Sequence, residues 1–168
     1  MGSDTLTKTA GEIATPGRIT DRHLLIALDG SKNAERALMY VADFLGGQKG
    51  FRVTLLRIVP ELSEDYFATQ DEHDKWIDDE TEKAEELLES YRGILIQSGF
   101  KPRKVGIHIT IGQCSSVAEC ILEHQKKLQC CTVVVGRRVI SRKEEFLFGS
   151  TSNRILRSEK RCALWVIE

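Results

Sequence analysis

The chain alternates short apolar runs with segments whose apolar residues recur every three or four positions. The apolar runs cover residues 23–28, 53–59, 105–111, 131–136 and 162–167. Runs of this length, rich in β-branched residues, are typical of strands in a sheet. Helical spacing occupies the intervals at residues 34–45, 76–95, 117–122 and 149–159. This alternation predicts an α/β fold: a doubly wound, mainly parallel five-stranded sheet with helices on both faces.

Residues 105–111 differ from the other apolar runs because apolar and polar residues alternate strictly there. A period of two indicates a strand with one less buried face, which favours a position near the edge of the sheet. The first 21 residues show no periodicity, so they predict a mobile N-terminal tail. We therefore expect the tail at 1–21 and one domain at 22–168.

Charge and hydropathy restrict the partners of this chain. The formal net charge is −1, so no overall field attracts nucleic acid or an anionic membrane, and neither is expected as a partner. The sequence contains no apolar run of about 18 residues and no signal peptide, which predicts a cytoplasmic protein. Residues 61–92 carry thirteen Asp or Glu, and this segment predicts either a solvated acidic helix surface or a docking face.

The sequence offers no recognisable catalytic or metal-binding motif. Its five cysteines lack C-x-x-C spacing and are interpreted as reduced thiols. Its four histidines are far apart in the sequence and are interpreted as surface or core residues. The motifs G-x-S-x-G, H-E-x-x-H and G-x-x-x-x-G-K-[ST] do not occur. The sequence therefore predicts neither catalytic residues nor a metal site.

Polar and small residues follow two of the expected strands and open the last helix. Asp29 ends the first strand, Gly136 ends the fourth, and residues 149–152 read Gly-Ser-Thr-Ser before the last helix. Free backbone N–H groups and hydroxyls at a helix start can hold phosphate. The alternative is that Asp29 and the Ser or Thr residues only cap helices and that the glycines only turn the chain.

These segments resemble the universal stress protein family, part of the adenine-nucleotide alpha-hydrolase-like superfamily. The resemblance spans residues 22–168 and is carried by Leu25-Ile26-Ala27-Leu28-Asp29-Gly30-Ser31, by Leu55-Leu56-Arg57-Ile58-Val59, by Val133-Val134-Val135-Gly136-Arg137-Arg138 and by Glu145-Phe146-Leu147-Phe148-Gly149-Ser150-Thr151-Ser152. It implies a stress-response protein with ATP or AMP, accompanied by Mg²⁺, in a nucleotide pocket.

The resemblance also implies a set of pocket residues. Asp29 and Ile58 would lie toward adenosine, and Gly136 and Gly149 toward the phosphates. The implied nucleotide-binding set is Ala27, Asp29, Ile58, Val135, Gly136, Val139, Gly149, Ser150 and Thr151. Nucleotide-binding members carry Gly-x₂-Gly-x₉-Gly-Ser or Gly-Thr, and here Val139 occupies the place of the middle glycine. Because a β-branched residue resists positive φ and adds bulk, Val139 is expected to weaken the pocket.

Three functions remain open from the residues. The first is a nucleotide-responsive binding protein that acts on protein partners still to be identified, with Arg137, Arg138, Arg142 and Lys143 either assisting phosphate binding or solvated. The second is a dimeric interaction module that binds no nucleotide. The third is a slow nucleotide hydrolase in which Asp29 holds a metal or a water. The hydrolase is the weakest of the three, because one carboxylate without a base partner accelerates little.

The last apolar run predicts a homodimer. Residues 162–167 are apolar at both alternating sets of positions, and no later element of this sequence is available to cover the strand. An exposed strand edge tends to pair with another chain, and twofold pairing of identical strands satisfies both edges. The resemblance implies the same interface. The alternative is an interior strand in a monomer.

Overall fold

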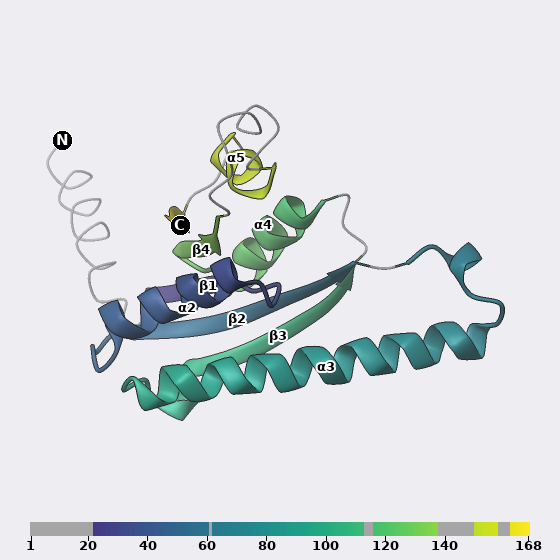
Figure 1. Cartoon of the computed structure of the whole chain (residues 1–168). Coiled ribbons are helices and arrows are strands. Elements are labelled where there is room, and N and C mark those ends of the chain that lie inside the picture. Colours follow the sequence, from purple (N-terminus) through teal and green to yellow (C-terminus); the bar gives the residue numbers. More distant parts are fainter. Residues whose placement is uncertain (1–21, 61, 113–115, 138–149, 158–161) are drawn as a thin grey trace, which may run out of the picture.

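The computed structural model describes residues 22–60, 62–112, 116–137, 150–157 and 162–168. Its strands are β1 (Arg22–Ala27), β2 (Phe51–Pro60), β3 (Val105–Gly112), β4 (Thr132–Gly136) and β5 (Ala163–Ile167). Its α-helices are α2 (Lys32–Leu45), α3 (Gln70–Gln97), α4 (Val117–Lys127) and α5 (Ser150–Arg157). Figure 1 shows their arrangement. The tail expected at residues 1–21 lies outside the described residues.

The strands form one parallel sheet in the order β3-β2-β1-β4-β5. Strand β1 is central, and its Ile26 is in register with Leu55 of β2 and Val134 of β4. The predicted α/β class with a parallel five-stranded sheet is therefore confirmed. Strand β3 lies at one edge, as its alternating pattern predicted, and β5 lies at the other.

Each face of the sheet has its own apolar layer. On one face, Leu24 and Ile26 pack with Leu38 of α2 and Leu88 of α3. On the opposite face, the alternate strand residues pack with α4 and α5, including Leu25, Ile121 and Ile155. Burying one such side chain contributes about 1.5–3 kcal/mol. Helices on both faces explain why the inner strands are continuously apolar.

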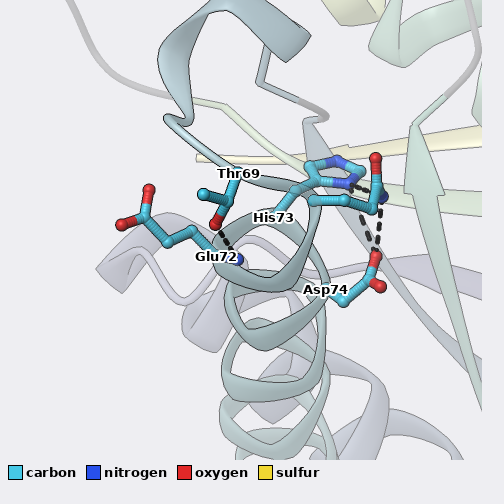
Figure 2. Close-up of polar contacts among 5 residues, drawn as sticks. Thr69, Glu72, His73 and Asp74 are labelled. Carbon is cyan, nitrogen blue, oxygen red and sulfur yellow. Dashed lines mark hydrogen bonds and ion pairs between the residues drawn. The ribbon is translucent and has the colours of Figure 1, made fainter.

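Helix α3 begins at a side-chain cap rather than at its first apolar residue. The Thr69 hydroxyl accepts a hydrogen bond from the Glu72 N–H at 3.2 Å (Figure 2). In return, the Glu72 carboxylate accepts one from the Ala68 N–H at 2.9 Å. The Gln70 side chain donates to Asp74 at 2.9 Å on the same turn. This cap starts the helix at Gln70, six residues before the expected start at residue 76.

The two halves of α3 lie in different environments. The second half packs on the sheet, whereas the first half extends past the carboxyl ends of β2 and β3 (Figure 1). Its buried residues all belong to the second half: Ala84, Leu88, Tyr91 and Leu95. The acidic positions of the first half are mostly exposed, which fits a solvated helix surface.

The cysteines differ in their bonding. Cys130, Cys131 and Cys162 are not in disulfides. Cys120 is disulfide-bonded. The expectation that all five cysteines are reduced is therefore wrong for Cys120, whose pairing no C-x-x-C spacing signalled.

Two histidine environments join distant elements. His23 is 6% exposed, and its ring nitrogens lie 3.1 Å from the Leu128 carbonyl and 2.8 Å from the Thr54 hydroxyl. His108 of β3 lies against His124 of α4, with ring centroids 4.8 Å apart. Burial lowers the pKa of His108, and positive charge on His124 and Lys127 lowers this pKa further. Protonating His108 is therefore unfavourable in the folded chain.

We expect the free energy of unfolding to decrease as the pH falls through 6.5, the ordinary histidine pKa. Below that value the unfolded chain binds a proton at His108 more readily than the folded chain does, so acid favours unfolding. Urea denaturation between pH 7.5 and 5.5 measures the effect. His108→Gln should reduce the slope of stability against pH, and an unchanged slope would contradict the assignment.

Candidate functional site

The order of the strands creates a switch point at the carboxyl ends of β1 and β4. The chain passes from β1 to β2 and β3 on one side and then crosses to β4 and β5 on the other. In open α/β sheets, ligands bind where the strand order reverses in this way. Ala27 and Val135, the last residues that β1 and β4 pair with each other, are in register here.

Three of the expected pocket residues lie on the same face of the sheet. Val135 is buried in the layer beneath α4 and α5, and Ala27 and Ile58 pack against that layer while remaining half-exposed. They come from β4, β1 and β2, which are neighbours in the sheet. The structure thus brings together apolar positions that are far apart in the sequence.

Asp29 lies in the turn that leads from β1 into α2. Its Oδ1 accepts a hydrogen bond from the Ser31 N–H at 2.9 Å, and the Ser31 hydroxyl accepts one from the Ala34 N–H at 3.2 Å and caps α2. Gly30 supplies the positive φ of 81° that the turn requires. Asp29 therefore stabilises the turn, which is the alternative role that the sequence allowed for it. The Asp29 side chain nevertheless remains exposed.

The charge on Asp29 is maintained by its neighbours. Partial burial opposes ionisation, but hydrogen bonds from Ser31 and the Arg57 charge hold the pKa of Asp29 below its ordinary value. Burial, together with the charges of Glu35 and Asp29, raises the pKa of the nearby Tyr91 phenol, although Arg57 opposes this. Sequence reasoning missed Arg57 and Tyr91 as neighbours of Asp29. The only local signal was an arginine inside the apolar run 53–59.

Gly136 has a packing reason to be glycine. A Cβ built on Gly136 would overlap the backbone carbonyl of Asn33 and lie 2.7 Å from the Ala34 nitrogen. The end of β4 therefore contacts the first turn of α2 directly. This contact holds the Gly136 backbone beside the turn that carries Asp29.

The phosphate end of the expected pocket is described only in part. Ser150 is the first residue of α5, and Thr151 is half-buried in its first turn. Val139 and Gly149 lie outside the described residues, so the middle and last glycine positions of the motif are not placed. The face of α5 that packs on the sheet includes Ile155, which is fully buried.

Arg137 does not extend the candidate site. Its guanidinium lies 3.3 Å from the Glu168 carboxylate, and its N–H donates to the Ile167 carbonyl at 2.7 Å. Both contacts attach the end of β4 to the end of β5. Arg138, Arg142 and Lys143, the other basic residues of this segment, lie outside the described residues.

One further surface feature is separate from this site. A shallow groove lined by Lys32, Glu35, Arg36 and Met39 lies along α2 and includes no residue of the expected pocket. Within the described ranges, no group of three or more His, Cys, Asp or Glu is placed to hold a metal ion. No helix of the same ranges is both long and apolar enough to cross a membrane.

The strand order and the polar turn after β1 define a doubly wound α/β protein with its candidate site at the switch point. The model of the universal stress protein family matches residues 21–166. The chain belongs to the universal stress protein family. A comparison with curated protein sequences found no match.

Solved structures of universal stress proteins share the fold. A family member from Burkholderia pseudomallei superposes with a TM-score of 0.67 at 19% identity, over 90% of this chain and 98% of its own. One from Archaeoglobus fulgidus, solved in complex with dAMP, gives 0.60 at 18%, over 89% and 99%. Another, solved in complex with cAMP, gives 0.60 at 14%, over 88% and 97%. At these identities the likeness establishes the fold.

Replacing Gly136 by Ala tests the contact between β4 and α2. The added methyl group collides with backbone, which cannot rotate away as a side chain can, so we expect a loss of about 2–3 kcal/mol in the free energy of unfolding. Gly93→Ala is the matched control, since a Cβ there meets nothing within 4 Å. In the interior of helix α3 it should stabilise the protein by about 0.5–1 kcal/mol. Urea denaturation compares the two variants, and equal effects would contradict this packing.

Proposed function

We propose that the chain is a stress-response protein that binds an adenine nucleotide at the carboxyl ends of β1, β2 and β4. The convergence of Ala27, Ile58 and Val135 beside the Asp29 turn supports this proposal most directly. An apolar surface next to a fixed carboxylate suits a nucleoside, which presents a flat apolar base and ribose hydroxyl donors. The dAMP and cAMP complexes of two relatives add support.

In this proposal each part of the site contacts a different part of the nucleotide. Ala27, Ile58 and Val135 contact the base, and the Asp29 carboxylate accepts hydrogen bonds from the ribose hydroxyls. Ser150 and Thr151 at the start of α5, with Gly136 and Gly149, lie toward the phosphates. Helix N-termini favour anions because their N–H groups lack intrahelical partners.

Mg²⁺ would enter with the nucleotide rather than bind alone. This ion keeps several water ligands and usually takes one or two carboxylates together with phosphate oxygens. Because this proposal assigns Asp29 to the ribose, the Mg²⁺ ligands would be phosphate oxygens and water. ATP and AMP are both compatible with the site, and AMP depends less on Mg²⁺ because it lacks the β and γ phosphates.

Binding without rapid turnover fits the charges around the site. Phosphoryl transfer requires a positioned nucleophile and cationic stabilisation of the transferring group. The Arg57 charge lowers the pKa values of Asp29 and Tyr91, whereas Arg137 pairs with Glu168 at the end of β5. We therefore propose a cytoplasmic binding protein whose nucleotide alters its contacts with protein partners.

The second candidate function is a dimeric interaction module without nucleotide. An aromatic surface on the outer side of α2 and β5 favours it. Tyr40 and Phe44 of α2 are 45% and 59% exposed. Their rings lie 6.3 and 6.0 Å from the ring of Trp165 in β5. Exposed aromatic clusters of this kind are enriched at protein interfaces.

A homodimer through β5 is part of both candidates. Strand β5 is an edge strand whose outer N–H and C=O groups face away from β4. The residues Leu164, Trp165, Val166 and Ile167 are only half-buried in the described chain. Pairing with β5 of a second copy would satisfy the backbone edge and cover these side chains. The aromatic surface lies directly beside this edge and would enlarge the interface.

Substitution of Val139 tests nucleotide binding. We expect weak ATP binding by the unmodified protein and about tenfold tighter binding by Val139→Gly. The family resemblance places a motif glycine at this position, and a branched residue at the positive φ open to such a glycine is strained by about 1–2 kcal/mol. Val139→Ala is the control, because it removes bulk but keeps the penalty at positive φ, and it should gain less. Calorimetric titration measures all three. Tight binding by the unmodified protein, or no gain with glycine, would contradict the role of Val139.

The nucleotide that accompanies the purified protein identifies the natural ligand. Mass spectrometry of material released by denaturation should detect an adenine nucleotide if the site is functional. Its absence, together with no titration response in any variant, would favour the interaction module.

A charge on β5 tests the dimer. Sedimentation equilibrium at micromolar concentration should give twice the 18.9 kDa of the single chain. Val166→Lys should return the mass to that of one chain, because a lysine in the paired strands would lie desolvated against an apolar partner. Thr110→Lys is the matched control, since it places the same charge on the opposite edge strand and should leave the dimer intact. Circular dichroism confirms that each variant is folded, and a monomeric unmodified protein would overturn the dimer.

A further inference from the structure

A group of thiols lies at the amino ends of β4 and β5, whereas the candidate nucleotide site lies at the carboxyl ends of the strands. Cys130 and Cys131 directly precede β4, and Cys162 directly precedes β5. About thirty residues separate Cys131 from Cys162, so the fold rather than local sequence brings them together. None of the three is in a disulfide.

The register of the sheet places Cys131 beside Cys162. Thr132 pairs with Ala163, the first residues of β4 and β5. The Ala163 N–H donates to the Cys131 carbonyl at 2.8 Å, which extends the ladder by one more residue. Neighbouring strands lie about 4.7–4.9 Å apart, and disulfides join Cα atoms about 4.4–6.8 Å apart. The backbones of Cys131 and Cys162 are therefore within the range of a disulfide.

The three thiols differ in reactivity. Cys130 is 1% exposed, and burial raises its pKa to about 12 although Arg52 opposes the shift. It therefore remains a protonated, inaccessible thiol at neutral pH. Cys131 is exposed and Cys162 is half-buried. Charge on either of them would raise the pKa of Cys130 further. The Cys131 thiol donates to the His23 carbonyl of β1 at 3.5 Å.

We propose that Cys131 and Cys162 form a reversible disulfide when the protein meets a peroxide. The exposed Cys131 thiolate attacks hydrogen peroxide, breaks the O–O bond and becomes a sulfenic acid with release of hydroxide. The Cys162 thiolate then attacks the Cys131 sulfur, the S–S bond forms, and a second hydroxide leaves. The released protons neutralise both hydroxides, so two thiols and one peroxide give one disulfide and two waters.

The disulfide would constrain the whole crossover between β4 and β5. This crossover contains α5 and the segment with Val139 and Gly149, and β5 is the edge strand at its end. Closing the loop restricts the unfolded chain, so it stabilises the folded arrangement. Cys131 is exposed, and exposed disulfides are more readily reduced than buried structural ones. The pair is therefore suited to respond to redox conditions rather than to be permanently bonded.

Peroxide treatment of the full chain tests the pair. After alkylation of the remaining thiols, unreduced tryptic peptides should include residues 128–137 linked to residues 162–168, with a mass about 2 Da below the sum of the two. Oxidation should raise the midpoint of thermal unfolding by about 5 °C or more. A thiol reductant should reverse both changes.

Three variants assign the bond. Cys131→Ser and Cys162→Ser should each lose the linked peptide and the thermal shift. Cys130→Ala is the matched control, because it changes the neighbouring thiol and should retain both. The proposal is overturned if the link survives in Cys131→Ser, if it joins two chains on a non-reducing gel, or if only irreversible oxidation products form.

Discussion

Hydrogen bonding of β1 on both sides is the constraint on which the rest of the structure depends. Its N–H and C=O groups are buried at the centre of the sheet, where unpaired groups would each cost about 1–3 kcal/mol, and β2 and β4 satisfy them. That pairing fixes one register. Ala27 then lies beside Leu56 and Val135, and Asp29 emerges beyond the edge of the sheet. A shift of one residue would turn the apolar set of β1 toward the wrong layers.

The contact between Gly136 and the first turn of α2 extends this constraint to the site. The backbone of β4 reaches the backbone of Asn33 because no Cβ intervenes. Ser31 caps this turn with its hydroxyl, and the Ser31 backbone N–H donates the hydrogen bond that fixes Asp29. One glycine therefore packs a strand against a helix at the place where the family motif expects a ligand. The same glycine can therefore serve both the packing of β4 on α2 and the binding of a ligand.

The crossover from β4 to β5 connects the carboxyl end of the sheet, which carries the candidate nucleotide site, with the amino end, which carries the thiol pair. Its start at Gly136 borders the candidate nucleotide site, and its end at Cys162 borders the thiol pair. Arg137 and Glu168 form an ion pair between the same two strands, but both side chains are well exposed, so the pair adds little stability. The placement of β5 thus depends mainly on its ladder with β4 and on the apolar layers beneath it.

The sequence by itself determined the alternation of strands and helices, because burial on both faces leaves a continuous apolar run and burial on one face leaves a helical period. It also placed Asp29 in the turn after the first strand and Gly136 at the end of the fourth. It missed the first six residues of α3, which follow the Thr69 cap and include no apolar residue to recognise. Only the tertiary structure decided the strand order, the influence of the Arg57 charge on Asp29 and the adjacency of Cys131 and Cys162. These depend on pairing between distant segments, which local periodicity does not encode.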